Sequence, residues 1–145
     1  MSIQSFKDLI VWKQSMKLVQ DVYLFTSRLP GYEKFRLGDQ MRRCAVSIPS
    51  NIAEGRNRST RREFAHFLRI ALGSSAELET QLLLTERIHH VESKNILLLL
   101  DEVQKMLSTV IRKLEGDYDK HQLKARSSQL SPTYWSKTSS CGSPP

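Results

Sequence analysis

The stretch SIPSNIAEGRNR, residues 47–58, decides how this chain folds. Pro49 has no backbone donor for the carbonyl of Ala45, and a proline inside a helix costs about 3 kcal/mol. A new helix beginning at this point would make Ile48 its N-cap, which is a poor capping residue. The apolar phase nevertheless runs through Pro49 to Ile52. The pattern therefore predicts one kinked but continuous helix.

The second half of the stretch predicts a corner. Gly55 is expected to end the helix, and Asn57, which tolerates left-handed backbone geometry, is expected to help turn the chain. Arg56 and Arg58 crowd this turn, next to the backbone donors that a following helix leaves free. A phosphate cradle is the alternative, but the glycine-rich loop with its Lys-Ser/Thr that marks nucleotide hydrolysis does not occur. We predict a structural corner lined with arginine, which is compatible with binding backbone phosphates.

Periodic apolar residues before the corner predict a long first helix. It follows a capping box formed by Ser5 and Asp8 and stops at Pro30. The helix carries two apolar stripes, which indicates that some apolar surface remains for neighbouring subunits. One stripe is Leu9, Trp12, Met16, Val19 and Tyr23, and the other is Val11, Leu18, Val22, Phe25 and Leu29.

Two further helices follow the corner. The third opens with a second capping box, from Thr60 to Glu63, and is predicted to run to His90. The fourth starts near Ser93 and is expected to end at Gly116 as a C-terminal cap. Short loops between successive helices favour antiparallel neighbours. The predicted fold is therefore an all-α, up-down-up-down four-helix bundle with a Pro-kinked second helix.

The bundle is expected to occupy residues 1–116. From residue 117 to residue 145 the chain is rich in serine and proline and has little to bury, which predicts a disordered tail. No run approaches the roughly 18 apolar residues of a membrane span, and the N-terminal residues lack the features of a signal peptide. Cys44 and Cys141 show no paired spacing of a disulfide or zinc site. We therefore expect a cytoplasmic protein without a membrane partner.

The net charge of +7 is concentrated in one segment of the chain. Residues 28–69 hold ten cations and four anions, and nine of the ten cations are arginine. The planar guanidinium group suits bidentate contacts with phosphate. A solvated helix face is the plain alternative, because residues that cluster in sequence need not cluster in space. The segment makes nucleic acid or another polyanion a candidate partner.

The sequence gives little support for a catalytic site. Two Glu-x-x-His pairs of the kind used in helical di-metal sites occur, Glu63 with His66 and Glu86 with His89. Both fall on the third predicted helix, roughly 35 Å apart, so they cannot share a metal cluster within one chain. The small residues 73–76 lack a histidine partner for a nucleophile and instead suggest close approach of another helix. We predict no enzymatic activity, no metal and no cofactor.

Three motifs, in order along the chain, carry a family resemblance: FKDLIVWKQSMKLVQDVY, QMRRCAVSIPSNIAEGRNR and FLRIALGSSAELETQL. Together they resemble the bacterial four-helix-bundle proteins encoded within 23S rRNA intervening sequences, from roughly Phe6 to Gly116. The resemblance implies a ring-like homopentamer with no enzymatic activity and a role in binding nucleic acid. It also implies a distant likeness to the accessory proteins of diversity-generating retroelements, which engage nucleic acid and a reverse transcriptase.

Some positions depart from the family pattern. Cys44 replaces a usual alanine, and Asn57 stands where glycine is common, which loosens the expected corner. Arg56, Arg61 and Arg62 are not a fixed part of the pattern. The pattern itself falls on Arg42, Arg43, Ser47, Pro49, Asn51, Glu54, Gly55, Arg58, Gly73, Ser74, Glu77 and Glu79.

These observations predict a non-enzymatic homo-oligomer, a pentamer by the resemblance, that binds RNA or DNA largely without sequence specificity. The alternative is a protein-interaction scaffold or accessory subunit for an acidic partner or a reverse-transcriptase-like enzyme. Internal pairing of Arg42 or Arg43 with Glu54 or Glu77 also stays open, and would make these arginines structural. The residues expected to bind nucleic acid are Arg42, Arg43, Arg56, Arg58, Arg61, Arg62 and Arg69.

Overall fold

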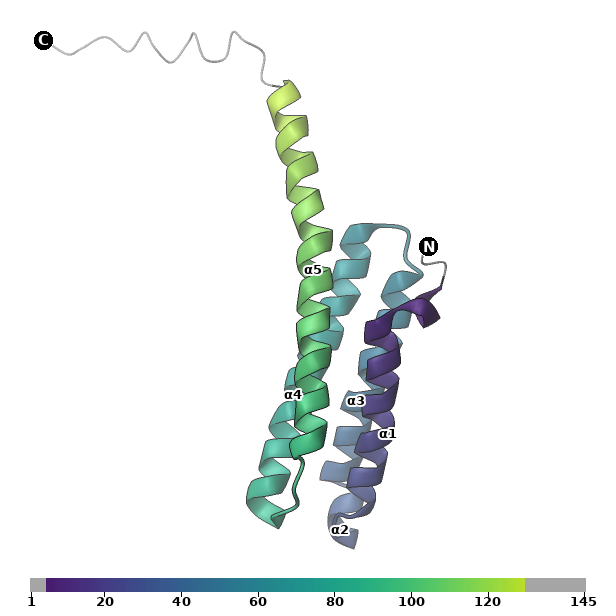
Figure 1. Cartoon of the computed structure of the whole chain (residues 1–145), viewed down its shortest axis with the longest axis vertical. Helices are drawn as coiled ribbons and strands as arrows, with labels where there is room; N and C mark the ends of the chain where they lie inside the picture. Colours follow the sequence, from purple (N-terminus) through teal and green to yellow (C-terminus); the bar gives the residue numbers. More distant parts are fainter. Residues whose placement is uncertain (1–4, 130–145) are drawn as a thin grey trace, which may run out of the picture.

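A computed structural model describes the backbone of residues 5–129 and, beyond residue 116, the side chain of Lys124 alone. Within this range four long helices run alternately up and down, and no strand occurs (Figure 1). The predicted all-α antiparallel bundle is confirmed. None of the described helices combines the length and hydropathy needed to cross a bilayer. In chain order the elements are η1 (Phe6–Asp8), α1 (Ile10–Ser27), α2 (Gly31–Lys34), α3 (Leu37–Arg56), α4 (Arg61–His89) and α5 (Lys94–Gln129).

Each long helix packs against two neighbours, because α1 and α4 both contact α3 and α5. The α1 stripe that begins at Val11 and includes Phe25 is buried in the core, as its spacing predicts. Full burial of a large apolar side chain stabilises the fold by about 1.5–3 kcal/mol. In the other α1 stripe, Met16 and Tyr23 remain 39% and 50% exposed. One side of α1 therefore keeps apolar surface in contact with solvent.

The helix ends follow the capping chemistry in most details. Ser5 and Asp8 form the predicted capping box, which caps the short η1 before α1 begins. At α4 the backbone N–H of Glu63 donates to the Thr60 hydroxyl at 3.2 Å, and that hydroxyl donates to the Glu63 carboxylate at 2.8 Å. His90 ends α4 with a left-handed φ of 54°. The start of α4 at the corner is thus held by local hydrogen bonds.

The corner forms differently from the prediction. α3 continues through Pro49, so the predicted continuous helix is confirmed. Gly55 does not end it: a Cβ at this position would lie 2.6 Å from Cβ of Phe67 and 3.0 Å from Cδ2 of Phe64. Asn57 has a φ of −83°, an ordinary right-handed value. The expected left-handed turn is wrong, and the glycine serves the close approach of α4 instead.

The predicted end of the fourth helix at Gly116 is also wrong. α5 passes through this glycine and reaches Gln129. One glycine in a helix interior costs about 1 kcal/mol, which is too little to stop a long helix. The last turns of α5 project beyond the other helices (Figure 1). Residues 117–129 of the predicted tail are therefore helical, whereas residues 130–145 lie outside the described residues.

Candidate nucleic-acid interface

The first turns of α4 and a neighbouring part of α5 form a surface hollow of about 540 Å³, which we call the corner hollow. Three of its lining residues are arginines. The first turn of α4 also presents the positive end of the helix dipole, which favours anions. The corner hollow is lined by Arg61, Arg62, Ala65, His66, Arg69, Leu114 and Glu115.

The α4 side of the corner hollow follows helical spacing. Arg62, His66 and Arg69 succeed one another at intervals of four and three residues, which places them on one face of α4. The sequence prediction treated His66 only as half of a metal pair and missed its position between two arginines. The spacing itself was the signal that could have found it. Glu115 is 46 residues from Arg69, so no local pattern could bring the two together.

Arg69 and Glu115 join α4 to α5 across the corner hollow. The guanidinium of Arg69 donates to both carboxylate oxygens of Glu115, from Nε to Oε1 at 2.9 Å and from Nη2 to Oε2 at 2.8 Å. Both side chains are accessible, with 58% and 43% of their surface exposed. An exposed pair of this kind contributes only about 0–1 kcal/mol. A phosphate group can therefore compete for the same planar donors.

The other arginines of the corner are held by short-range contacts. Arg58 pairs with Glu54 one turn earlier in the sequence, and its guanidinium carbon lies 4.9 Å from the centre of the Phe67 ring. Its side chain is still 43% exposed. Arg56 and Arg61 also make interactions with neighbouring groups. The structure thus brings the corner arginines to one end of the bundle, and part of their charge is already compensated.

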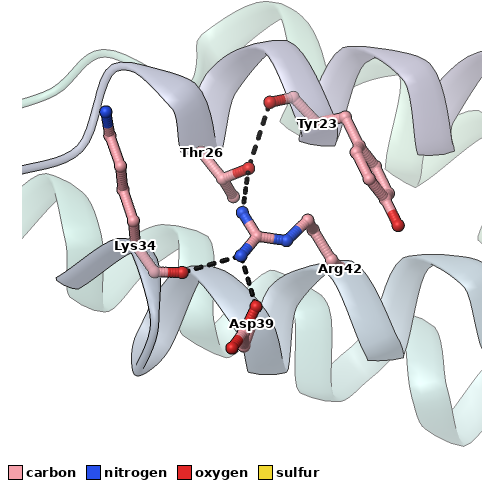
Figure 2. Close-up of polar contacts among 5 residues, drawn as sticks. All are labelled: Tyr23, Thr26, Lys34, Asp39 and Arg42. Atoms are coloured by element: carbon pink, nitrogen blue, oxygen red, sulfur yellow. Dashed lines mark hydrogen bonds and ion pairs between the residues drawn. The ribbon is translucent and has the colours of Figure 1, made fainter. Parts of the chain in front are cut away.

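Arg42 lies elsewhere and serves the fold (Figure 2). Its guanidinium donates to the Thr26 hydroxyl at 3.0 Å and to the Lys34 carbonyl at 2.7 Å, and it pairs with the Asp39 carboxylate. It also lies 5.8 Å from the centre of the Tyr23 ring, and the side chain is only 20% exposed. These contacts join α1, α2 and α3. Arg42 is therefore structural, although its carboxylate partner differs from those considered in the sequence.

Arg43 is exposed on α3, about 20 Å along the helix from the corner. It borders a smaller polar groove between α3 and α4, where the hydroxyls of Ser47 and Ser74 lie 2.9 Å apart. Burial raises the pKa of the Cys44 thiol in this groove, and the neighbouring carboxylate of Glu77 raises that pKa further. The structure does not bring Arg43 together with the corner hollow.

The two Glu-x-x-His pairs remain separate. Glu86 accepts hydrogen bonds from the hydroxyl and the backbone N–H of Ser93, at 2.7 and 2.9 Å, and these bonds hold the pKa of Glu86 below its ordinary value. His89 faces a different residue, with Nε2 at 3.5 Å from Oε1 of Glu33. Among the side chains that the structure describes, no three His, Cys, Asp or Glu residues are placed to share a metal ion.

The fold and this surface define a class: a small helical bundle whose accessible arginines gather where the second and third long helices meet. The chain belongs to the 23S rRNA-intervening sequence protein family, whose family model matches residues 7–109. It is also similar to a crystal structure of a protein of unknown function from the S23 ribosomal protein family of Bacteroides thetaiotaomicron. That likeness has a TM-score of 0.64 at 25% identity and covers 71% of this chain and 96% of the other. No curated protein matches the sequence.

Proposed function

We propose that this protein binds RNA or DNA through the corner hollow, without catalysing a reaction and largely without reading sequence. The observation that carries the proposal is the gathering of Arg61, Arg62 and Arg69 around one accessible hollow at the dipole end of α4. Contacts of this kind are directed at backbone phosphates, which carry no sequence information. The family description, 23S rRNA-intervening sequence protein, associates the family with an rRNA and names no ligand; a nucleic-acid partner in the cytoplasm is part of the proposal.

The proposal implies a specific salt dependence. Three arginine–phosphate contacts correspond to a slope of about −2.7 in log affinity against log salt for duplex DNA, and about −2.1 for a single strand. Raising salt about fourfold should therefore weaken binding roughly 40-fold or 20-fold, respectively. The single contact area is small, so the affinity of one copy is expected to be modest.

Self-association would multiply this weak contact, and we propose a homo-oligomer of five copies. The support within the chain is the apolar surface on α1, where Val19, Tyr23 and Leu24 border a second, largely apolar hollow. Leu24 is 67% exposed. Several corner hollows in one assembly would bind one nucleic acid with increased avidity.

Fluorescence anisotropy with a labelled oligonucleotide across a salt series tests the corner hollow. Replacing both Arg61 and Arg62 by glutamine should make the slope of log affinity against log salt less steep by about two. Arg43→Gln is the matched control, because it removes one exposed charge about 20 Å away and should leave the slope almost unchanged. Circular dichroism and mass measurement must show intact helices and assembly. Equal slopes for the corner variant and the parent protein would refute the assignment.

An acidic protein partner is the second candidate function. The observation in its favour is the bidentate ion pair between Arg69 and Glu115, because it shows that a carboxylate fits the guanidinium of Arg69. In that case the protein would act as a scaffold or accessory subunit, for example beside a reverse-transcriptase-like enzyme. No nucleic-acid binding even at low salt would favour this candidate over the first.

A further inference from the structure

The end of the bundle opposite the corner hollow carries two unusually exposed aromatic side chains. Tyr32 lies on the one-turn helix α2 and is 65% exposed, and Phe35 follows α2 directly and is 79% exposed. Figure 1 places α2 at the far end of α3 from the corner. The 20 residues of α3 set the separation at about 30 Å. Burying large aromatic surface is favourable, so a ligand that covers these rings gains binding free energy.

The backbone that carries these rings is held in place from two sides. On one side Arg42 donates to the carbonyl of Lys34, which anchors α2 to α1 and α3 (Figure 2). On the other side the ring of His89, at the end of α4, packs edge-on against Tyr32 at 6.1 Å and lies beside Glu33. The aromatic pair therefore stands on a fixed support, with its exposed surface toward solvent.

The charges around the pair favour an anion. Arg28 and Arg36 flank α2 in the chain, and both are exposed. Of the two carboxylates in this segment, Asp39 pairs with Arg42, and Oε1 of Glu33 lies 3.5 Å from Nε2 of His89. Within the described chain, the guanidinium of Arg36 has no hydrogen-bond or ion-pair partner. The segment around α2 therefore combines two exposed aromatic rings with two exposed arginines, and the guanidinium of Arg28 also lies 5.7 Å from the centre of the Phe25 ring.

We propose that a single-stranded segment of nucleic acid binds at this α2 surface, with bases stacked on Phe35 and Tyr32 and phosphates at Arg28 and Arg36. Aromatic rings beside arginines are the combination that single strands require, because every base has a face to stack and every nucleotide carries a phosphate. In a duplex the bases already stack on one another, so the aromatic rings add no stacking free energy to duplex binding. An uncharged apolar partner would leave the arginines unused. The inference rests on the proposed function for its class of ligand, but it uses other residues.

Paired binding measurements with a labelled 20-nucleotide poly(dT) strand and a duplex of about the same length test this inference. Changing Phe35 and Tyr32 together to alanine should weaken poly(dT) binding by at least about fivefold, and up to about 150-fold per lost stack, with duplex binding unchanged. Phe35→Trp should retain single-strand binding. Ile10→Ala is the control, because it removes a 66% exposed apolar side chain on α1. Both rings are largely exposed, so the double variant should keep its fold.

The outcomes separate the two proposals. Equal poly(dT) affinity for the parent and the aromatic variant would overturn the single-strand site, whatever the corner variants do. The exposed rings would then be assigned to contact with a protein partner. Duplex and single-strand binding that both depend on Arg61 and Arg62, with no effect of the aromatic change, would support the corner hollow alone. Single-strand binding that depends on Phe35 but not on the corner arginines would support the α2 surface and refute the corner.

Discussion

Replacing Gly55 with alanine is a sharp test of how α3 meets α4. The new Cβ would lie 2.6 Å from Cβ of Phe67, a separation that Cβ atoms essentially never show. Because the Phe67 atom is attached directly to the backbone of α4, no rotation of a side chain can relieve the contact. The two helices must move apart. Overpacking of this kind costs about 1–3 kcal/mol, and the backbone contact argues for the upper end, about 3 kcal/mol.

Part of that cost is offset by helix propensity. Alanine is more favourable than glycine in a helix interior by about 1 kcal/mol. The free energy of unfolding should therefore fall by about 2 kcal/mol for Gly55→Ala, from the difference of these two effects. In a chain of this length such a loss lowers the melting temperature by roughly 6 °C.

Gly73→Ala is the matched control on the partner helix. Gly73 lies in the middle of α4, is exposed, and a Cβ there would meet nothing within 4 Å in the described chain. The close approach expected for Gly73 from the sequence is therefore not found within one chain. The substitution should raise the free energy of unfolding by about 1 kcal/mol.

The assay is urea unfolding followed by far-UV circular dichroism, at one protein concentration for all variants. The two glycine variants should shift the midpoint in opposite directions, although the chemical change is the same. A Gly55→Ala protein as stable as its parent would refute the close contact between α3 and α4. A destabilised Gly73→Ala protein would instead show that another copy of the chain packs against this position.

Three further predictions concern polar contacts and helix length. Arg42→Met removes the hydrogen bonds of a guanidinium that is only 20% exposed, so it should lower the free energy of unfolding by about 2 kcal/mol. Arg43→Met is the control and should change the free energy of unfolding by less than about 0.5 kcal/mol. Urea unfolding of the two variants measures the difference. Ser93→Ala should raise the pKa of Glu86 toward its ordinary value, as followed by NMR titration. The folded-state pKa of this carboxyl is lowered, so its contribution to stability is present above the unfolded pKa and is lost as pH falls through the folded pKa. The parent should therefore lose more stability than the variant on acidification. Gly116→Ala should increase helical content and stability by up to about 1 kcal/mol; a loss of helicity by circular dichroism would indicate that α5 ends at this glycine.

The sequence by itself determined the number, type and order of the long helices. The α1 stripe with Val11 and Phe25 is buried as its spacing predicts, and the hydroxyl of Thr60 caps α4. The apolar phase through Pro49 correctly indicated one helix in place of two. These features are local, because a stripe at helical spacing has one apolar face and a cap needs only a neighbouring hydroxyl. The helix end at Gly116 was mispredicted, since one glycine is a weak stop signal.

Only the tertiary structure decided what each arginine does. Arg42 and Arg43 are neighbours in the sequence, yet one guanidinium meets polar groups of α1 and α2 while the other faces solvent. Arg69 meets Glu115 on α5, and Gly55 is required where α4 approaches. Charge counts and periodicity give the face of a helix but not the groups that another helix places against it. That information arises only when the helices pack and polar groups distant in sequence have to satisfy one another.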